Sequence, residues 1–304
     1  MRRLKRRGRP AADGQKRKGK MVMKSIGYYN GKSGPLEEMT VPMNERACYF
    51  GDGVYDATAV INHVPMALEE HIERIYRSAS LIDIRIPMER EEMKAVLLGL
   101  IEQVEGDVLM LYWQVTRGVG MRNHAYAGAE GEPSVWAFVK PMQMRDPYGA
   151  YRCITMEDTR FFHCNIKTIN LLPAVIASQR AHEAGCAETI LHRGERVTEC
   201  SHSNVHILKD GVLRTAPLDN LILPGIARAH IIAICREKGI PVAEEPFTVR
   251  EMMEADEIMI SSSSALCCRV CEIDGQKVGM KDEKTFAAIR DAYQQEMERE
   301  CGLA

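Results

Sequence analysis

The sequence lacks the features that mark several large protein classes. No apolar run approaches the ~18 residues of a membrane-spanning helix, so we expect no membrane contact. Ten cysteines among 304 residues are too few for a disulfide scaffold, and they are scattered, which favours free thiols in a reducing cytoplasm. The 23 glycines and 13 prolines follow no period, which excludes a collagen-like chain. With 45% hydrophobic residues, the chain can bury a core and is expected to be globular.

The familiar nucleotide and metal motifs are also missing. There is no P-loop and no H-E-x-x-H zinc motif, and Gly51-x-Gly53 lacks the third glycine of a dinucleotide fingerprint. Cys268 and Cys271 form a lone C-x-x-C motif, but in an extended segment these two positions point to opposite faces. We therefore expect no metal site and interpret these thiols as buried side chains.

Positive charge is concentrated in residues 1–20. This segment holds ten Lys or Arg and one acid, so the rest of the chain holds 30 bases and 41 acids. Like charges without apolar periodicity predict a disordered basic tail, and without an apolar h-region a signal peptide is not expected. A nucleic-acid-binding arm is one interpretation. We favour a solvated extension, or a start codon placed upstream of Met21 or Met23.

Residues 21–304 are predicted to form two α+β domains. Breakers in residues 141–149 indicate a linker, which predicts a small domain over residues 21–142 and a larger one over residues 143–304. Turn residues predict hairpins at Asn30-Gly31, at 61–63 and at Asp210-Gly211. Helices are expected, from apolar spacing and end signals, at 69–82, 90–104, 171–184, 222–239 and 282–300, and strands at 107–118, 134–141 and 151–157.

Two charged residues stand among apolar neighbours. If residues 197–208 form one regular strand, Glu199 shares a face with Val197, Ser201 and Ser203. A carboxylate buried there requires a cationic partner; alternatively, the strand turns Glu199 to solvent. Lys167 has apolar neighbours, and a buried lysine can be an amine nucleophile, unless it reaches the surface through its long side chain.

Two further segments carry groups that could bind anions. Leu223–Arg228 presents a glycine at a helix start, where the amides of Ile226 and Ala227 could bind an anion together with hydroxyls of Ser261–Ser264. Arg122 and His124 lie two residues apart in a loop after a buried strand. They can converge on a carboxylate or remain solvated.

Together these segments resemble the class IV pyridoxal-phosphate aminotransferases, and most closely their D-amino acid (D-alanine) branch. The similarity runs from about Ile26 to about Met297, which is nearly all of the body. It rests on motifs that follow one another at the family's spacing: FGDGVYD at 50–56, EEHIER at 69–74, YWQVTRG and RNH at 112–124, CNIKTINLL at 164–172, HRGERVTECSHSN at 192–204 and LPGIAR at 223–228.

The resemblance implies roles for these residues. Lys167 matches the lysine that holds pyridoxal 5'-phosphate and moves the substrate proton, and Glu199 matches the acid that pairs with the ring nitrogen. The implied phosphate site consists of Arg74, the amides of Ile226 and Ala227 and the hydroxyl of Ser263. The implied trap for the substrate α-carboxylate consists of Tyr55, Arg122 and His124.

The resemblance also implies an assembly and a fold. In the family the Arg-x-His pair comes from the neighbouring subunit, so a homodimer is expected. The implied fold is α+β, with a small α/β N-terminal domain and a larger C-terminal pseudo-barrel domain that bind the cofactor between them.

We therefore expect a D-amino acid:2-oxo acid aminotransferase that converts D-alanine and 2-oxoglutarate to pyruvate and D-glutamate by ping-pong chemistry. Arg122-x-His124 favours this reaction over those of branched-chain L-amino acid aminotransferases and aminodeoxychorismate lyases. A non-catalytic cofactor- or nucleic-acid-binding protein is the third alternative.

The chain departs from the family at three places. Thr58 and Ala59 stand where a charged or polar residue is frequent. Cys200-Ser201-His202-Ser203 replaces a serine-rich run. Arg269 follows Ser264 where relatives carry a different pattern, and it is either a charge at the pocket mouth that favours acidic side chains or a surface charge. These departures concern side-chain specificity.

Overall fold

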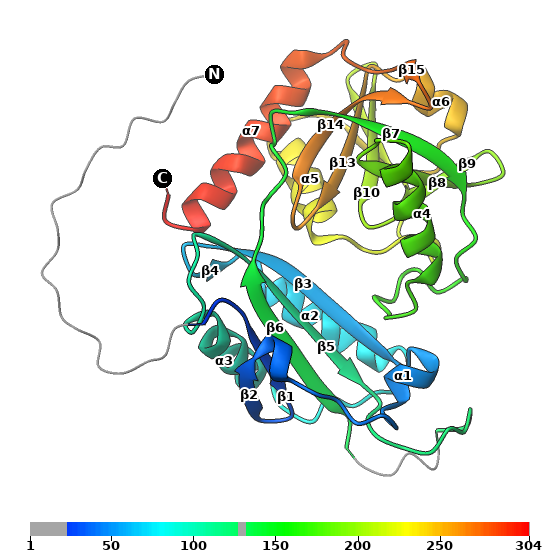
Figure 1. The fold of residues 1–304 in the computed structure, drawn as a ribbon. Helices are drawn as coiled ribbons and strands as arrows, with labels where there is room; N and C mark the ends of the chain where they lie inside the picture. Colours follow the sequence, from blue (N-terminus) through cyan, green and yellow to red (C-terminus); the bar gives the residue numbers. More distant parts are fainter. Residues whose placement is uncertain (1–22, 127–131, 304) are drawn as a thin grey trace, which may run out of the picture.

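Two β-sheets with helices packed against them make up the protein (Figure 1). The structure is a computed structural model and describes residues 23–126 and 132–303. The basic tail expected at residues 1–20 lies outside these ranges. Within the described residues, no helix is both long enough and apolar enough to cross a bilayer.

The first sheet is antiparallel, in the order β2-β1-β6-β5-β3-β4. Its β1–β2 hairpin turns at Asn30 and Gly31, which both have positive φ, as the sequence predicts. Buried side chains of α2 and α3 form one core cluster with strands of this sheet. The elements are β1 (Ile26–Tyr29), β2 (Lys32–Pro35), η1 (Leu36–Glu38), α1 (Arg46–Phe50), β3 (Gly53–Ile61), β4 (Val64–Pro65), α2 (Leu68–Ser80), α3 (Arg90–Ile101), β5 (Val108–Thr116) and β6 (Ser134–Pro141).

The second sheet is mixed, in the order β12-β11-β10-β13-β14-β7-β8-β9, with β15 paired to β14. Helices α5 and α7 share one core cluster with this sheet, and that cluster also includes Ala59, Ile61 and Met66 from the β3–β4 hairpin. The elements are β7 (Ala150–Glu157), α4 (Leu172–Glu183), β8 (Glu188–Arg193), β9 (Arg196–Cys200), β10 (Asn204–Lys209), β11 (Val212–Thr215), α5 (Ile226–Glu237), β12 (Val242–Glu244), α6 (Val249–Met253), β13 (Glu257–Ser262), β14 (Leu266–Ile273), β15 (Gln276–Lys277) and α7 (Glu283–Glu300).

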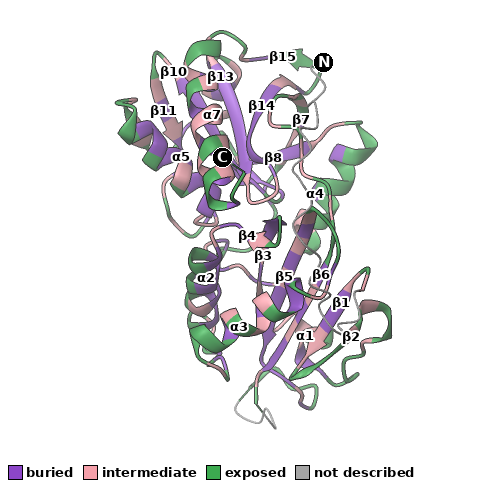
Figure 2. Cartoon of the chain, turned by 90° about the vertical axis from the view of Figure 1, so that its left-hand side faces the viewer, coloured by how far each residue is buried: buried purple, intermediate pink, exposed green. Residues whose placement is uncertain are grey.

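Burial follows the two sheets. Figure 2 shows buried residues along the strands and exposed residues on the outer faces of α2, α3 and α4. The tip of the long β3–β4 hairpin packs into the core of the second sheet, so β3 belongs to one sheet and contacts the other. Residues of β3 and residues of the second sheet that face a common site are therefore held in fixed positions relative to one another.

One local prediction is wrong. Residues 197–208 are not a single strand, because β9 ends at Cys200 and β10 begins at Asn204. The N–H of Cys200 donates to the carbonyl of Ser203 at 2.7 Å, which closes a tight turn. The turn draws the hydroxyls of Ser201 and Ser203 onto the buried carboxylate of Glu188, so the expected alternation of faces stops at Cys200.

Candidate active site

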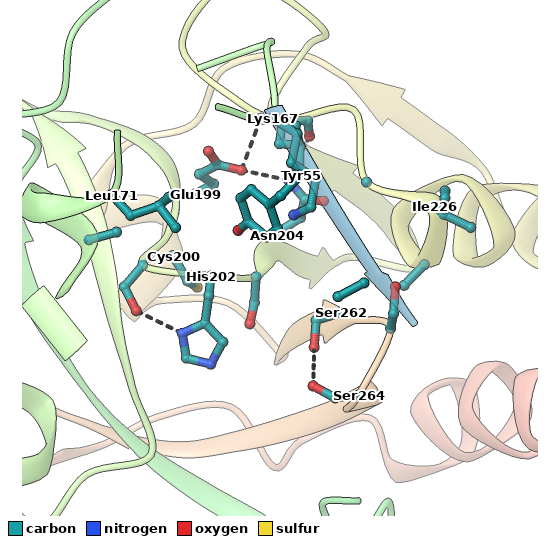
Figure 3. A pocket seen from close by; sticks show the side chains of 18 of the residues that line it. Tyr55, Lys167, Leu171, Glu199, Cys200, His202, Asn204, Ile226, Ser262 and Ser264 are labelled. Atoms are coloured by element: carbon teal, nitrogen blue, oxygen red, sulfur yellow. Dashed lines mark hydrogen bonds between the residues drawn. The ribbon is translucent and has the colours of Figure 1, made fainter. Parts of the chain in front are cut away.

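A cavity of about 350 Å³ lies between the two sheets. Its lining comes from β3 and β5 of the first sheet, from the segment before α4, from the β9–β10 turn, from the start of α5 and from the serine-rich turn after β13. Figure 3 labels lining residues from most of these segments, among them Tyr55 on β3, Lys167 before α4, His202 in the β9–β10 turn and Ser264 after β13. The cavity brings together most of the predicted site residues: Tyr55, Arg74, Lys167, Glu199, Ile226, Ala227 and Ser263.

Lys167 belongs to a segment that is fastened to β3. The N–H of Tyr55 donates to the carbonyl of Lys167 at 2.9 Å, and Thr168 forms a bridge with Val54. The Nζ atom of Lys167 lies 4.3 Å from the centroid of the Tyr55 ring, within range of a cation–π contact. The amine therefore turns to the cavity, and the alternative of a surface lysine is wrong.

Glu199 is buried at the end of β9 and held by three donors. Its Oε1 accepts from Nη1 of Arg160 at 2.5 Å, and its Oε2 accepts from Nδ2 of Asn204 and from the N–H of Leu223, both at 3.0 Å. Burial raises the pKa of Glu199 above its ordinary value, although the charge of Arg160 opposes this shift. The strand thus carries a buried, paired carboxylate, and the solvent-facing alternative is wrong.

Arg160 supplies the cation that this carboxylate requires. Its Nε and Nη2 donate to the two oxygens of Asp158 at 2.9 Å, which fixes the plane of the guanidinium. Burial alone would lower the pKa of Arg160, but its hydrogen bonds to Asp158 and the charge of Glu199 raise it above its ordinary value.

Arg74 is fixed by a second buried carboxylate. Its Nε and Nη2 donate to Asp56 at 2.9 and 2.7 Å. Burial alone would raise the pKa of Asp56, but Arg74 and His71 hold it well below its usual range. The remaining nitrogen, Nη1, lies 3.5 Å from the carbonyl of Pro224, just before α5. The guanidinium therefore stands beside the start of that helix.

The start of α5 is an uncapped helix end at the cavity. No side chain caps the helix at Gly225, and the amides of Ile226 and Ala227 have no intrahelical acceptor. A Cβ on Gly225 would lie 2.0 Å from Oδ1 of Asn204, so only glycine fits there. These amides and Arg74 Nη1 together form an anion site.

His71 links Ser263 to Asp56, the carboxylate that orients Arg74. The Nδ1 of His71 lies 2.7 Å from Asp56 and its Nε2 lies 3.3 Å from Oγ of Ser263. Burial lowers the pKa of His71, so the ring is neutral at pH 7. Because Asp56 only accepts, the ring proton sits on Nδ1 and the Ser263 hydroxyl donates to Nε2.

Arg122 and His124 are not in the cavity of their own chain. Both are exposed, and both lie against Phe50 at the end of α1: Cζ of Arg122 is 5.5 Å from the ring centroid, and the His124 ring is 5.2 Å away. The two side chains are thus gathered on one aromatic ring and turned outward.

Arg269 fits neither alternative offered by the sequence. It is buried, with Nε donating to Glu257 at 2.7 Å and Nη1 paired with Glu283. Since it is absent from the cavity lining, it is neither a pocket charge nor a free surface charge. Cys268 and Cys271 bond separate carbonyls, and the described residues contain no cluster able to hold a metal ion.

The model of the class IV amino-transferase family matches residues 53–273, a range that includes every residue lining the cavity and most strands of both sheets. The chain belongs to the class IV aminotransferases. The family predicted from the sequence is confirmed, and so is the prediction that the protein is a transaminase. Class IV aminotransferases are pyridoxal-phosphate enzymes, and this chain has the α+β fold of that class.

Curated relatives and solved structures agree with this family. The chain is 41% identical to the D-alanine aminotransferase of Listeria monocytogenes over 271 residues, 88% of this chain and 94% of the relative. It is 38% identical to that of Bacillus licheniformis, over 83% and 89% of the two chains. A branched-chain aminotransferase from Thermoproteus uzoniensis superposes with a TM-score of 0.80 at 24% identity, covering 91% and 95%. The branched-chain amino acid aminotransferase from Escherichia coli gives 0.81 at 23%, covering 91% and 96%.

Four residues that organise this class IV site were not predicted from the sequence. Asp56 and His71 orient Arg74, and Arg160 and Asn204 hold Glu199. Asp56 and His71 lie within quoted motifs, and an acid at a buried strand position could have pointed to a partner for Arg74. Arg160 stands in no motif, and its link to Glu199 spans 39 residues.

Proposed function

We propose that this class IV enzyme is a D-amino acid:2-oxo acid aminotransferase that uses pyridoxal 5'-phosphate to convert D-alanine and 2-oxoglutarate to pyruvate and D-glutamate. The observation that carries the proposal is one cavity that joins an amine, a buried carboxylate and an anion site. The 41% identity to a D-alanine aminotransferase supports this specificity. Branched-chain enzymes share the fold, and their lower identity makes that alternative the weaker one.

The residues present fit the cofactor. The amides of Ile226 and Ala227, with Arg74 Nη1, suit a phosphate dianion. Ser263 lines the same cavity, and its hydroxyl would turn from His71 to donate to that phosphate. Burial disfavours the charge of Glu199 and raises its pKa. A protonated ring nitrogen beside Glu199 would supply a further positive charge to balance this carboxylate. Lys167 offers its amine in the same cavity.

The chemistry that the cofactor supplies when bound is a carbonyl for the amino group and a ring that withdraws the electron pair left at the substrate Cα. Lys167 would take the Cα proton at Nζ and return it, within the same half-reaction, to the cofactor carbon that comes to carry the amino group. Glu199 holds a proton at the ring nitrogen, and Arg160 and Asn204 hold Glu199 in place. The donor leaves as an oxo acid before the second oxo acid binds, which gives ping-pong kinetics.

A homodimer completes the site in this proposal. Tyr55 lines the cavity, whereas Arg122 and His124 face outward, which supports the expectation that a partner subunit supplies them. An exposed apolar surface lies beside the cavity and offers an interface. It consists of Phe161, Phe162, Leu171, Leu172, Val175 and Ile176.

Two further expectations become proposals here. We assign residues 21–142 and 143–304 to separate domains, because the described part of the first range holds the first sheet and the second range holds the second sheet. We place the enzyme in the cytoplasm, because its ten cysteines are free thiols and most are buried.

The deciding experiment measures oxo acid formation by the purified enzyme supplied with pyridoxal phosphate. Pyruvate is measured for D-alanine and L-alanine, and 4-methyl-2-oxopentanoate for L-leucine, each with 2-oxoglutarate. Reactions without acceptor run alongside, with D-alanine and with aminodeoxychorismate. We expect acceptor-dependent activity with D-alanine alone, and its loss in Lys167→Ala. Activity with L-leucine would identify a branched-chain enzyme, and pyruvate from aminodeoxychorismate without acceptor would identify a lyase.

A further inference from the structure

His202 stands at the cavity where the family pattern has a small polar residue. It lies in the turn between β9 and β10, and its side chain is 47% exposed. It lines the same cavity as Lys167 and Ser264, and Figure 3 shows its ring well apart from Lys167. The proposed proton transfer does not use it.

A buried carboxylate holds this imidazole. Glu188, on β8, is fully buried and accepts from four groups: Oγ of Ser201, Oγ of Ser203 at 2.9 Å, the N–H of Thr189 at 3.0 Å, and Nδ1 of His202 at 3.0 Å. Burial alone would raise the pKa of Glu188, but His202 and the hydroxyl donors hold it below its ordinary value. Glu188 is therefore a carboxylate and only accepts.

This arrangement fixes the ring. The Ser201 hydroxyl donates to Glu188, so it too accepts from Nδ1 of His202, 2.9 Å away. Both neighbours of Nδ1 are acceptors, so Nδ1 carries a proton. Among the described residues, Nε2 has no hydrogen-bond partner. When the ring holds both protons, it donates from Nδ1 to the protein and from Nε2 to an anionic ligand in the cavity.

The other cations of the cavity are already engaged. Arg74 is bidentate on Asp56, and Arg160 is shared between Asp158 and Glu199. Lys167 acts at the substrate Cα in the proposed mechanism. The geometry points to His202 as the group that binds the distal carboxylate of dicarboxylic substrates, 2-oxoglutarate and D-glutamate. This inference rests on the proposed aminotransferase function and names the residue that distinguishes dicarboxylic from monocarboxylic substrates.

The test uses His202→Asn, because the Asn amide keeps a donor near the position of Nδ1 and removes Nε2. With D-alanine as the fixed donor, we expect KM for 2-oxoglutarate to rise about tenfold, the worth of one charge-assisted hydrogen bond. KM for 2-oxobutyrate and both kcat values should stay within about twofold. His182→Asn, which replaces an exposed residue of α4, is the matched control. It should change KM for neither acceptor.

A binding measurement on the holoenzyme separates this inference from the proposed function. Glutarate should raise the melting temperature of the wild type more than pentanoate does, and this difference should disappear in His202→Asn. Equal effects of the substitution on both acceptors, or an unchanged preference for glutarate, would overturn the inference. Absence of D-alanine turnover with either acceptor would refute the proposed function instead, and the glutarate comparison would still decide the role of His202.

Discussion

Nη1 of Arg160 lies 2.5 Å from Oε1 of Glu199, so the buried carboxylate at the end of β9 is paired within the protein. Its other oxygen is held by an amide side chain and a backbone N–H. The protein itself therefore pairs and orients this carboxylate. The pair therefore has consequences for stability as well as for the proposed reaction.

Removing the guanidinium should destabilise the protein. We expect Arg160→Met to lower the free energy of unfolding of the apoenzyme by about 3 kcal/mol, because it leaves Glu199 buried without its cation and Asp158 with Arg193 as its remaining guanidinium partner. Urea denaturation followed by circular dichroism measures this change. Arg180→Met, which breaks an exposed pair with Glu183, is the control and should cost less than about 1 kcal/mol. An equally small loss for Arg160→Met would mean that the pair is solvated.

Gly225 should tolerate no side chain. A Cβ there would lie 2.0 Å from Oδ1 of Asn204, so Gly225→Ala displaces the amide that holds Glu199 and disturbs the start of α5. We expect at least tenfold weaker binding of pyridoxal phosphate, about 1.4 kcal/mol or more, measured by absorbance titration of the apoenzyme. Gly99→Ala in α3 meets nothing within 4 Å and should stabilise the protein by up to about 1 kcal/mol. Unchanged affinity in Gly225→Ala would show that Asn204 moves aside freely.

Activity should return when two inactive variants share a dimer. If the partner subunit supplies Arg122, a mixed dimer of Lys167→Ala and Arg122→Ala chains has one site with both residues intact. Co-expression of the two chains with different tags should then restore about a quarter of the wild-type activity, since random pairing makes half of the dimers mixed. Each variant expressed alone is the control. No recovery in the purified mixed dimer would place Arg122 in the site of its own chain.

The distance along the chain between interacting residues decides which features the sequence predicts. Apolar spacing located α2 and α5, and Asn30-Gly31 marked its hairpin, because these signals depend on neighbouring residues. The turn at residues 201–203 depends on Glu188, which lies 13 residues before Ser201 and draws the hydroxyls inward.

The site residues also divide into those in local motifs, which the sequence predicts, and those that act over a long distance along the chain. Lys167, Glu199 and Arg74 stand in ordered motifs and meet in one cavity as expected. The partner of Glu199 lies 39 residues away in no motif, so local patterns gave no signal for it. Arg122 is exposed, and its proposed role depends on a second chain, which the periodicity of one chain does not describe.

His230 should make stability depend on pH. It lies on α5 with Nδ1 2.7 Å from Glu296 of α7 and Nε2 3.0 Å from Glu70 of α2, and its ring stacks on Tyr293. Both nitrogens face acceptors, so the doubly protonated ring satisfies both carboxylates. Burial alone would lower the pKa of His230, but the two glutamates raise it above its ordinary value.

The sign of the effect follows from that shift. A raised folded-state pKa gives stability that is fully present below the unfolded value, about 6.5, and is lost as pH rises through the folded value. We therefore expect His230→Gln to reduce the free energy of unfolding more at pH 6 than at pH 9, measured by urea denaturation at both values. The exposed His182→Gln serves as control and should show the same small difference at each pH. A loss for His230→Gln that is equal at pH 6 and pH 9 would mean that the ring contributes through packing on Tyr293, because only the charged contribution disappears when the proton leaves.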